Sequence, residues 1–468
     1  MVFKMNNASS LVNNIATPKT VSFQHISKRI ASLSLPMALS QLINFASAFL
    51  CTAMLAQLGQ EVLAASALMI STQISLMVTA ISLLLALSVL VGHAYGAKNY
   101  SAIGIFLQLG WILALFISLP LIFIYLHLDK ILLYFGQSPS IVIITQQYFH
   151  VSVLNVVPCL LAVCNQQFGY GIRKVKLMIL ISFLSVLVLL PTAYALILGK
   201  WGLPQLGVAG LAYAQLAQNT FYLLATTACF YWGKSFKHFD LFTYRAHKNW
   251  RSILQMFKIG WPISLQMSGE MLAFFVSAIM VGWIGTTALA AYQVVNQYLF
   301  LVIVPVFALS QATGILISHA CGAGNYHEVK KLGDISLYLI LIICSMVAAI
   351  FLLMPHSLAA IYLNTQQQTD VATIQLVVVL FTIVAFSQVF DGIRNVLTGA
   401  LRGIFDTRFA MLIGLLVLWG IGMPLSYVLA FPLHYGVIGV MLGSAVGMLI
   451  GAIVMFARWR VLVKQYRG

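Results

Sequence analysis

The chain has 468 residues, of which 61% are hydrophobic and only 7% are charged, whereas a soluble domain carries about 25% charged residues. So few charges cannot cover a protein surface in water, which excludes a soluble globular fold and indicates that lipid surrounds most of the chain. The net charge of +16 does not indicate nucleic-acid binding, because the basic residues form short clusters between long apolar segments and not one patch.

Taken in chain order, the apolar segments predict an all-α integral membrane protein with twelve transmembrane helices, since each spanning helix needs about 20 apolar residues. The expected helices are 30–57, 63–92, 103–127, 139–168, 176–199, 205–232, 257–284, 287–318, 332–354, 370–400, 409–431 and 435–457. They divide the chain into a polar cytoplasmic tail (1–29), an N-terminal six-helix bundle (30–232), a cytoplasmic linker (233–256), a C-terminal six-helix bundle (257–457) and a basic cytoplasmic tail (458–468).

The basic residues predict the orientation of these helices in the membrane. With this assignment, 22 of the 25 Lys and Arg residues fall on one side, Lys130 and Lys200 fall on the other, and Arg394 lies within a helix. Basic residues are enriched in cytoplasmic loops. We therefore expect a multi-pass protein of the bacterial inner membrane with both termini in the cytoplasm.

The two halves of the chain repeat each other at a spacing of 226 residues, which later increases to 232 and 233. The matched positions are Pro36 and Pro262, Gly59 and Gly285, GHAYGAKNY (92–100) and SHACGAGNY (318–326), Gly171 and Gly403, and Pro191 and Pro424. Each half holds an even number of helices, so both halves enter the membrane from the same side and the pseudo-two-fold axis lies along the membrane normal. Transporters that work by alternating access have this architecture, and a duplicated scaffold without a transport role is the alternative.

These segments resemble the MATE (multidrug and toxic compound extrusion) family, particularly its NorM-like branch. The resemblance covers about residues 27–463. It is carried by Pro36 and Pro262, the two repeated segments, Gly269-Glu270, Asp391, Leu401-Arg402-Gly403 and Asp406-Thr407-Arg408. It implies two bundles around a V-shaped cavity, and export of cationic or amphipathic compounds in exchange for Na⁺ or H⁺.

Of the nine acidic residues, only Glu270 and Asp391 lie well inside predicted helices. A charged side chain at the bilayer centre costs at least about 2.5–3.5 kcal/mol on insertion scales, so each is a candidate ion-coupling residue. A carboxyl removed from water can hold a proton, a Na⁺ ion or a cationic drug, but not all together, and antiport requires such competition. The structural alternatives are that Gln266 at i−4 holds Glu270 neutral, and that Arg394 at i+3 pairs with Asp391.

The first half has no intramembrane acid, so we expect ion coupling to depend on the second half. The counterpart of Glu270 is Asn44, Asp391 aligns with Cys159, and the helix-one aspartate found in many members of the family corresponds to Cys51. Na⁺ would need several oxygen ligands, whereas H⁺ needs only one carboxyl, and the sequence leaves both ions open. The candidate Na⁺ ligands beside the two acids are Ser268, Ser387, Gln388 and Asn296.

The helices that carry the acids, and their repeat partners, also supply a candidate substrate cavity. Its predicted lining residues are Gln41, Asn44, Gln266, Met267, Tyr292, Asn296 and Tyr298. Tyrosine rings there would attract flat organic cations. His93 and His319 end two predicted helices, which favours capping of the helix C-termini over a proton-relay role.

Together these patterns predict a secondary active antiporter that exports cationic or amphipathic drugs and toxic compounds in exchange for Na⁺ or H⁺ by alternating access. The alternative is a flippase for a lipid-linked or polyprenyl-type substrate, whose phosphate would need several basic residues; only Arg394 qualifies. No enzyme motif is present, and the six cysteines lack metal-ligand spacing. We expect a monomer in the lipid bilayer whose partners are small organic cations, with no cofactor besides the coupling ion.

Overall fold

A computed structural model describes residues 22–243, 250–362 and 368–465, and within these ranges every regular element is a helix. The first half contains α1 (Phe23–Ala56), α2 (Gln60–Leu84), α3 (Ala86–Gly96), α4 (Tyr100–Leu126), α5 (Leu128–Tyr134), α6 (Pro139–Gly171), α7 (Val175–Leu198), α8 (Val208–Trp232) and the 3₁₀ helix η1 (Lys234–Phe239). The second half contains α9 (Trp250–Ile284), α10 (Thr286–Gly322), α11 (Tyr326–Leu353), α12 (Pro355–Ala360), α13 (Gln368–Gly403), α14 (Thr407–Leu415), the π-helix η3 (Leu416–Gly422), α15 (Met423–Ala430) and α16 (Gly436–Gln465).

The predicted all-α membrane fold is confirmed. Among the described residues, 11 helical segments are long and apolar enough to cross a membrane. The remaining predicted helix is α8, which forms but carries more polar residues. These face α6: Tyr148 donates a hydrogen bond to Gln215 at 2.6 Å, and Asn219 donates one to Asn155 at 3.0 Å. Polar side chains bonded inside the bundle are compatible with a helix that spans the membrane.

Several helices extend beyond the predicted bounds. α1 begins at Phe23 and not at residue 30, α9 begins at Trp250 and not at 257, and α16 continues to Gln465 and not to 457. The prediction followed apolar composition, but a helix continues past its apolar part when long basic side chains can reach water. Most of the expected N-terminal tail, and residues 244–249 of the expected linker, lie outside the described residues.

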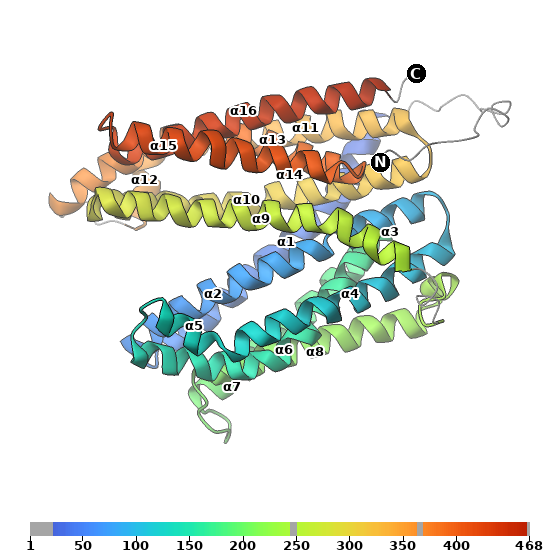
Figure 1. The fold of residues 1–468 in the computed structure, drawn as a ribbon, viewed down its shortest axis with the longest axis horizontal. Coiled ribbons are helices and arrows are strands. Elements are labelled where there is room, and N and C mark those ends of the chain that lie inside the picture. Colours follow the sequence, from blue (N-terminus) through green and yellow to red (C-terminus); the bar gives the residue numbers. More distant parts are fainter. Residues whose placement is uncertain (1–21, 244–249, 363–367, 466–468) are drawn as a thin grey trace.

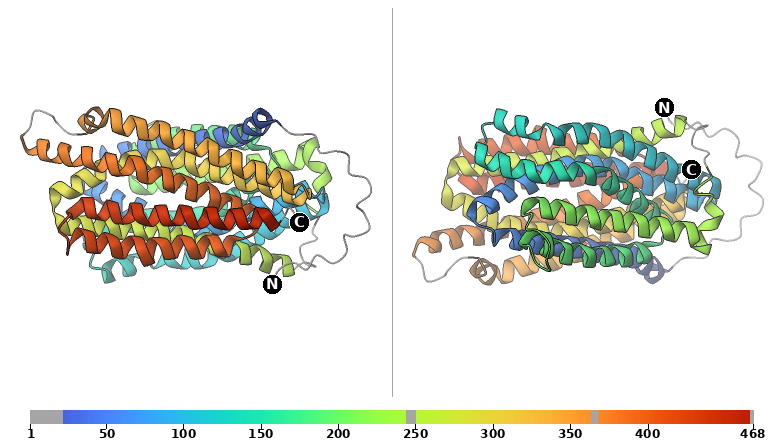
Figure 2. Two further views of the ribbon diagram at one scale, coloured as in Figure 1. Left: turned by 90° about the horizontal axis from the view of Figure 1, so that it is seen from above. Right: turned by 90° about the horizontal axis from the view of Figure 1, so that it is seen from below.

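The helices of the two halves gather on opposite sides of the molecule (Figure 1). Seen from above and from below, the helices of both halves run roughly along the long axis (Figure 2). The halves approach each other at the end where α16 finishes and diverge toward the opposite end (Figure 1). We call the first the basic end, because Lys98, Arg173, Lys174, Arg408 and Lys464 lie there. Across the halves, α1 and α3 contact α10, and α2 contacts α9.

The sequence repeat has a local structural basis. Gly59 and Gly285 precede α2 and α10 with φ of +116° and +143°, a conformation that residues with a Cβ rarely adopt. Asn99 and Asn325 precede α4 and α11, and each side chain accepts a hydrogen bond from a backbone N–H of the first helical turn. The repeated glycines and asparagines therefore begin the same helices in both halves.

Large apolar side chains cover the outside of the molecule. Phe49, Phe123, Phe275 and Phe386 are each at least 60% exposed. In water such a surface would be an aggregation hazard. Facing lipid, it is the expected surface of a membrane protein.

Candidate functional site

The two intramembrane carboxylates lie close together and share one arginine. Arg394 of α13 donates from Nη1 to Oε1 of Glu270 on α9 at 2.7 Å. It also donates from Nε and Nη2 to Oδ1 of Asp391, one turn earlier on α13, at 3.1 and 2.8 Å. The alternative that Asp391 pairs with Arg394 is therefore realised, and the same arginine also binds Glu270. We call these three residues the buried charge cluster.

Further polar residues surround the buried charge cluster. Gln266, which is 1% exposed, donates to Oε1 of Glu270 at 3.1 Å. The side-chain oxygen Oε1 of Gln266 accepts a hydrogen bond from Nη2 of Arg402 at 3.2 Å. Asn395 donates to Oδ2 of Asp391 at 3.0 Å. The predicted contact between Gln266 and Glu270 thus exists, within a larger network.

Burial and charge balance explain why this network is stable in a membrane. The side chains of Glu270, Arg394 and Asp391 are 12%, 10% and 17% exposed. Isolated charges at this level of burial would each cost several kcal/mol, but paired and hydrogen-bonded charges cost much less. With Arg402 included, two carboxylates face two guanidinium groups. A proton or a cation that joins the network therefore changes its balance of charge.

Sequence reasoning missed Arg402. It was assigned to the basic side of the membrane, outside the helix, but it lies inside α13 and is 8% exposed. The signal was present, because Arg394 and Arg402 are eight residues apart and therefore share a helix face. Apolar composition alone ended the predicted helix at residue 400, before this second arginine.

Close to the buried charge cluster, α9 also binds the first half. Ser264 donates to the backbone oxygen of Thr79 on α2 at 2.6 Å, and the hydroxyls of Ser268 and Thr79 are 2.8 Å apart. Ser268, a predicted Na⁺ ligand, therefore bonds across the two halves. It lies only two residues from Glu270, so changes at Glu270 are close to this contact.

At the basic end, the two repeated segments cross each other. A Cβ at Gly96 would collide with the backbone oxygen of His319, and a Cβ at Gly322 would collide with that of His93. The rings continue the contact: His319 lies against Tyr95, and His93 lies against Phe405. Only glycine allows this close approach of α3 and α10. At this crossing the two halves are in direct contact.

The paired histidines lie in the last turns of α3 and α10, as expected for helix caps. The ring of His319, however, reaches the other half. Its Nε2 lies 2.6 Å from the backbone oxygen of Gly171, the last residue of α6. That oxygen has no partner within its own helix. His319 therefore caps a different helix from the one that carries it.

The other predicted ion ligands lie at varying distances along the same helices. Gln388 lies one turn before Asp391 on α13. Its amide nitrogen donates to the backbone oxygen of Cys344 at 3.0 Å, while its buried Oε1 has no hydrogen-bond partner among the described residues. Ser387 bonds to a backbone oxygen in its own helix. Asn296, which is 9% exposed, lies near the buried Tyr292 on α10.

The predicted cavity residues differ in how far they are buried. On α1, Gln41 is half-buried and Asn44 is exposed, and Met267 on α9 is half-buried. Tyr292 is only 3% exposed, so its ring is part of the core. Tyr298 packs against aromatic rings and donates to the backbone oxygen of Leu358 at 2.8 Å. Tyr292 is therefore buried in the core, while Tyr298 is only half-buried.

A family model named MatE matches residues 36–195 and 262–428. The two matches begin 226 residues apart and end 233 residues apart, which are the spacings found in the sequence repeat. The chain belongs to the MatE family. This membership confirms the resemblance drawn from the repeated segments, and it makes the chain a membrane transporter and not an enzyme.

Individual MatE proteins agree with this assignment. A probable multidrug resistance protein NorM from Synechocystis is 27% identical over 439 residues, covering 94% of this chain and 95% of the relative. The multidrug resistance protein NorM of Burkholderia vietnamiensis is 28% identical over 461 residues, covering 97% of each. The MATE transporter VcmN of Vibrio cholerae, in its bent form, superposes with a TM-score of 0.83 at 18% identity, covering 95% of this chain and 98% of that one. At that identity the superposition shows a shared fold.

Proposed function

We propose that this chain is a secondary active antiporter that exports cationic or amphipathic drug-like compounds in exchange for Na⁺ or H⁺. The multidrug resistance proteins among its relatives support the substrate class. The observation that carries the proposal is the buried charge cluster, in which Glu270 and Asp391 share Arg394 at the junction of α9 and α13. Intramembrane carboxylates of this kind mark ion pathways.

The cluster offers a mechanism for coupling. Glu270 is its only member on α9, so its pair with Arg394 joins α9 to α13. A proton or Na⁺ on Glu270 neutralises its charge and weakens this pair, leaving Arg394 bound to Asp391 on its own helix. Because Ser264 and Ser268 of α9 bond to α2, the change reaches the surface where the halves meet. An organic cation that binds Glu270 competes with the coupling ion.

Two oxygen atoms are available to such an ion. Oε2 of Glu270 accepts no hydrogen bond from a described residue, and Oε1 of Gln388 is buried without a partner. An oxygen lone pair without a donor can accept a cation or a water molecule. Oε2 of Glu270 could accept either H⁺ or Na⁺, so the proposal keeps both ions.

The orientation is part of the proposal. Basic residues favour the cytoplasmic side, which supports a cytoplasmic position for the basic end in a bacterial inner membrane. In the conformation described here, the crossing of α3 and α10 then lies toward the cytoplasm. Alternating access would open this crossing and bring the diverging ends of the two halves together.

Transport by proteoliposomes tests the proposal. We would follow efflux of the fluorescent cation ethidium under an imposed Na⁺ gradient and then under a pH gradient, for wild type, Glu270→Gln and Glu61→Gln. Each inward charge gains about 2.3 kcal/mol per 100 mV, enough to drive export against a gradient of tens-fold. We expect gradient-driven efflux by wild type and at least a roughly tenfold loss in Glu270→Gln, because each 1.4 kcal/mol of lost coupling is tenfold.

Glu61→Gln is the matched control, because Glu61 is exposed in the first turn of α2, away from the buried charge cluster. It should transport like wild type. The ion gradient that drives wild-type efflux names the coupling ion. Efflux unchanged in Glu270→Gln would rule out Glu270 as the coupling residue.

One observation favours a second function. Arg402 adds a second buried arginine to the C-terminal half, and a phosphate would bind well to two guanidinium groups. This supports a flippase for a lipid-linked or polyprenyl-type substrate. Both arginines, however, already have acidic or amide partners in the network, so the exporter remains the first choice. Translocation of a fluorescent polyprenyl phosphate, with no ethidium efflux under either gradient, would reverse this order.

A further inference from the structure

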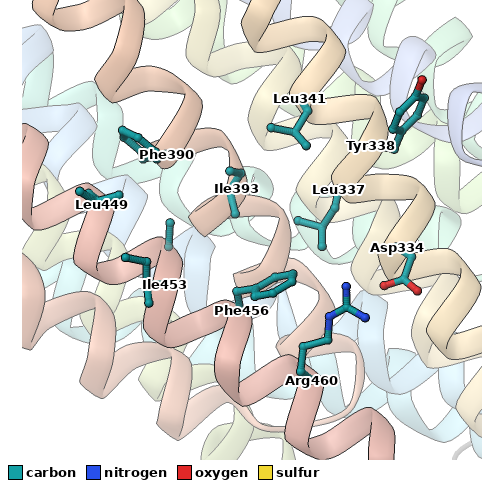
Figure 3. Close-up of a pocket in the computed structure, with 11 residues that line it drawn as sticks. Asp334, Leu337, Tyr338, Leu341, Phe390, Ile393, Leu449, Ile453, Phe456 and Arg460 are labelled. Carbon is teal, nitrogen blue, oxygen red and sulfur yellow. The ribbon is translucent and has the colours of Figure 1, made fainter.

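A groove lies on the outer surface of the C-terminal half, and its lining contains no member of the buried charge cluster. Helices α11, α13 and α16 surround a cavity of about 590 Å³. That volume lies within the range of about 300–1,000 Å³ that is usual for small-molecule sites. Figure 3 shows the side chains of these three helices directed into the space between them. We call this cavity the outer groove.

The walls of the outer groove are apolar along most of its length. Leu337 and Leu341 line it from α11, Phe390 from α13, and Ile453 and Phe456 from α16. Ile453 is 59% and Leu341 is 39% exposed, so the groove is open to the surroundings of the helix bundle. In a membrane those surroundings are lipid chains, so a hydrocarbon chain is the occupant that these walls fit.

The length of the outer groove matches one leaflet. On α16 its lining runs from Leu449 to Arg460, which at about 1.5 Å per residue is roughly 16 Å. The hydrocarbon core of a bilayer is about 30 Å thick, so this is about half of it. The groove begins near the basic end, where α16 finishes (Figure 1). It therefore extends across the leaflet at the basic end.

Two opposite charges stand at the mouth of the outer groove. Figure 3 shows Asp334 of α11 and Arg460 of α16 at the same end, with the guanidinium group directed toward the carboxylate. Neither forms an ion pair with another residue in ranges 22–243, 250–362 and 368–465. The guanidinium carbon of Arg460 lies 4.8 Å from the ring centre of Phe456, which holds it over the apolar wall. A positive and a negative group thus lie side by side where a lipid headgroup would be.

We infer that the outer groove binds a phospholipid with an ethanolamine headgroup. One acyl chain lies along Leu337, Leu341 and Ile453, the phosphate binds Arg460, and the ammonium group binds Asp334. Guanidinium and phosphate form strong charge-assisted hydrogen bonds, and the ammonium group has three N–H donors for a carboxylate. A choline headgroup has no such donors. A glycerol headgroup leaves Asp334 facing a net negative charge.

Native mass spectrometry of the purified full-length protein tests this inference. Equimolar dioleoyl phosphatidylethanolamine, phosphatidylcholine and phosphatidylglycerol compete for binding. A hydrogen bond between two charged groups is stronger than a neutral one, and solvent near the surface weakens it, so we expect roughly fivefold preference for ethanolamine lipid over choline lipid. Arg460→Gln should lower retention of all three lipids, because every one carries the phosphate.

Asp334→Asn separates the headgroup contact from general loss of structure. This variant should lose the preference for ethanolamine over choline lipid and retain more glycerol lipid than wild type does. Ile453→Trp should lower binding of all three lipids by filling the groove without changing any charge. Lys464→Gln is the control, because Lys464 lies one turn beyond Arg460 on α16 and does not line the groove.

Equal retention of the three lipids by wild type would overturn the inference, since it would indicate a non-specific lipid surface. A loss in Lys464→Gln equal to that in Arg460→Gln would also overturn it. The readout is lipid binding, so it does not depend on whether the protein exports drugs.

Discussion

Arg394 donates hydrogen bonds to both intramembrane carboxylates, so removing its charge deprives Glu270 and Asp391 of the one cation that bonds to them directly. Breaking a buried pair by removing one partner is more costly than replacing the whole set by neutral groups. The cluster therefore predicts that loss of Arg394 is costly while Glu270 and Asp391 are charged, and less costly once both are replaced by neutral amides.

We expect Arg394→Leu to lower the free energy of unfolding by about 3–5 kcal/mol. Adding Glu270→Gln and Asp391→Asn should restore part of that loss, because both buried carboxylates are then neutral and only the charge of Arg402 remains in the network. Thermal unfolding in detergent, followed by intrinsic fluorescence, measures both effects. Arg458→Leu is the control: its pair with Asp406 is 35% and 21% exposed, so its loss should cost less than about 1 kcal/mol. A triple variant less stable than Arg394→Leu would contradict the charge argument.

The sequence predicted which individual residues are unusual, but not which of them contact each other across helices. Glu270 and Asp391 stood out because acids inside apolar helices are rare and costly. The contact between Asp391 and Arg394 followed from their spacing on one helix. The hydrogen bond from Arg394 to Glu270 joins residues that are 124 positions apart and lie on different helices. Residue spacing in a single sequence cannot predict such a long-range contact. The paired charges are thus a tertiary feature.

The elements show where apolar composition is a reliable guide and where it is not. The predicted helices formed, because twenty apolar residues in lipid must satisfy their backbone groups as a helix. The ends were less predictable, since α9 and α16 continue through basic residues. The π-helix η3 was also unpredicted, because a wider turn has no distinct composition. Trp419 of η3 donates to the backbone oxygen of Gly269, beside Glu270, at 3.1 Å.

The close contact of helices α3 and α10 can be tested by substitution of its glycine. Gly96→Ala places a methyl group against the backbone of His319, and overpacking of this kind costs about 1–3 kcal/mol. The crossed arrangement should therefore become less populated, and the half-buried Cys321 at the end of α10 should become more reactive. We expect severalfold faster alkylation of Cys321 by N-ethylmaleimide, measured by peptide mass spectrometry.

Gly282→Ala provides the comparison for that experiment, since nothing lies within 4 Å of a Cβ at Gly282. It should leave the alkylation rate of Cys321 unchanged. If Gly96→Ala and Gly282→Ala gave the same rate, the crossing would not control access to the basic end.

The whole molecule consists of two halves that contact each other through a few helices. The bonds between Thr79 on α2 and Ser264 and Ser268 on α9 link the halves. At the basic end, Arg29 of α1 also forms an ion pair with Glu328 of α11. If transport requires the halves to rotate against each other, a covalent link at this surface must stop it.

The double variant Thr79→Cys/Ser268→Cys tests this directly. The two hydroxyl oxygens are 2.8 Å apart, and a disulfide needs sulfur atoms about 2.05 Å apart, so a small adjustment suffices. We expect oxidation to reduce ethidium efflux in proteoliposomes to background and dithiothreitol to restore it. Thr79→Cys alone should not respond to oxidation. Full transport by the oxidised double variant would mean that the halves do not separate along α2 and α9.

The crossing glycines have a consequence for the history of this architecture. Gly96 meets His319 and Gly322 meets His93, so each repeat supplies one glycine and one histidine to a reciprocal contact. That reciprocity defines the self-complementary interface of a two-fold homodimer. A six-helix ancestor carrying one such segment would already possess both partners of the contact and could close against its own copy. Fusion of two such copies would need only a connecting segment, and the buried acids and arginines could then arise in one half alone.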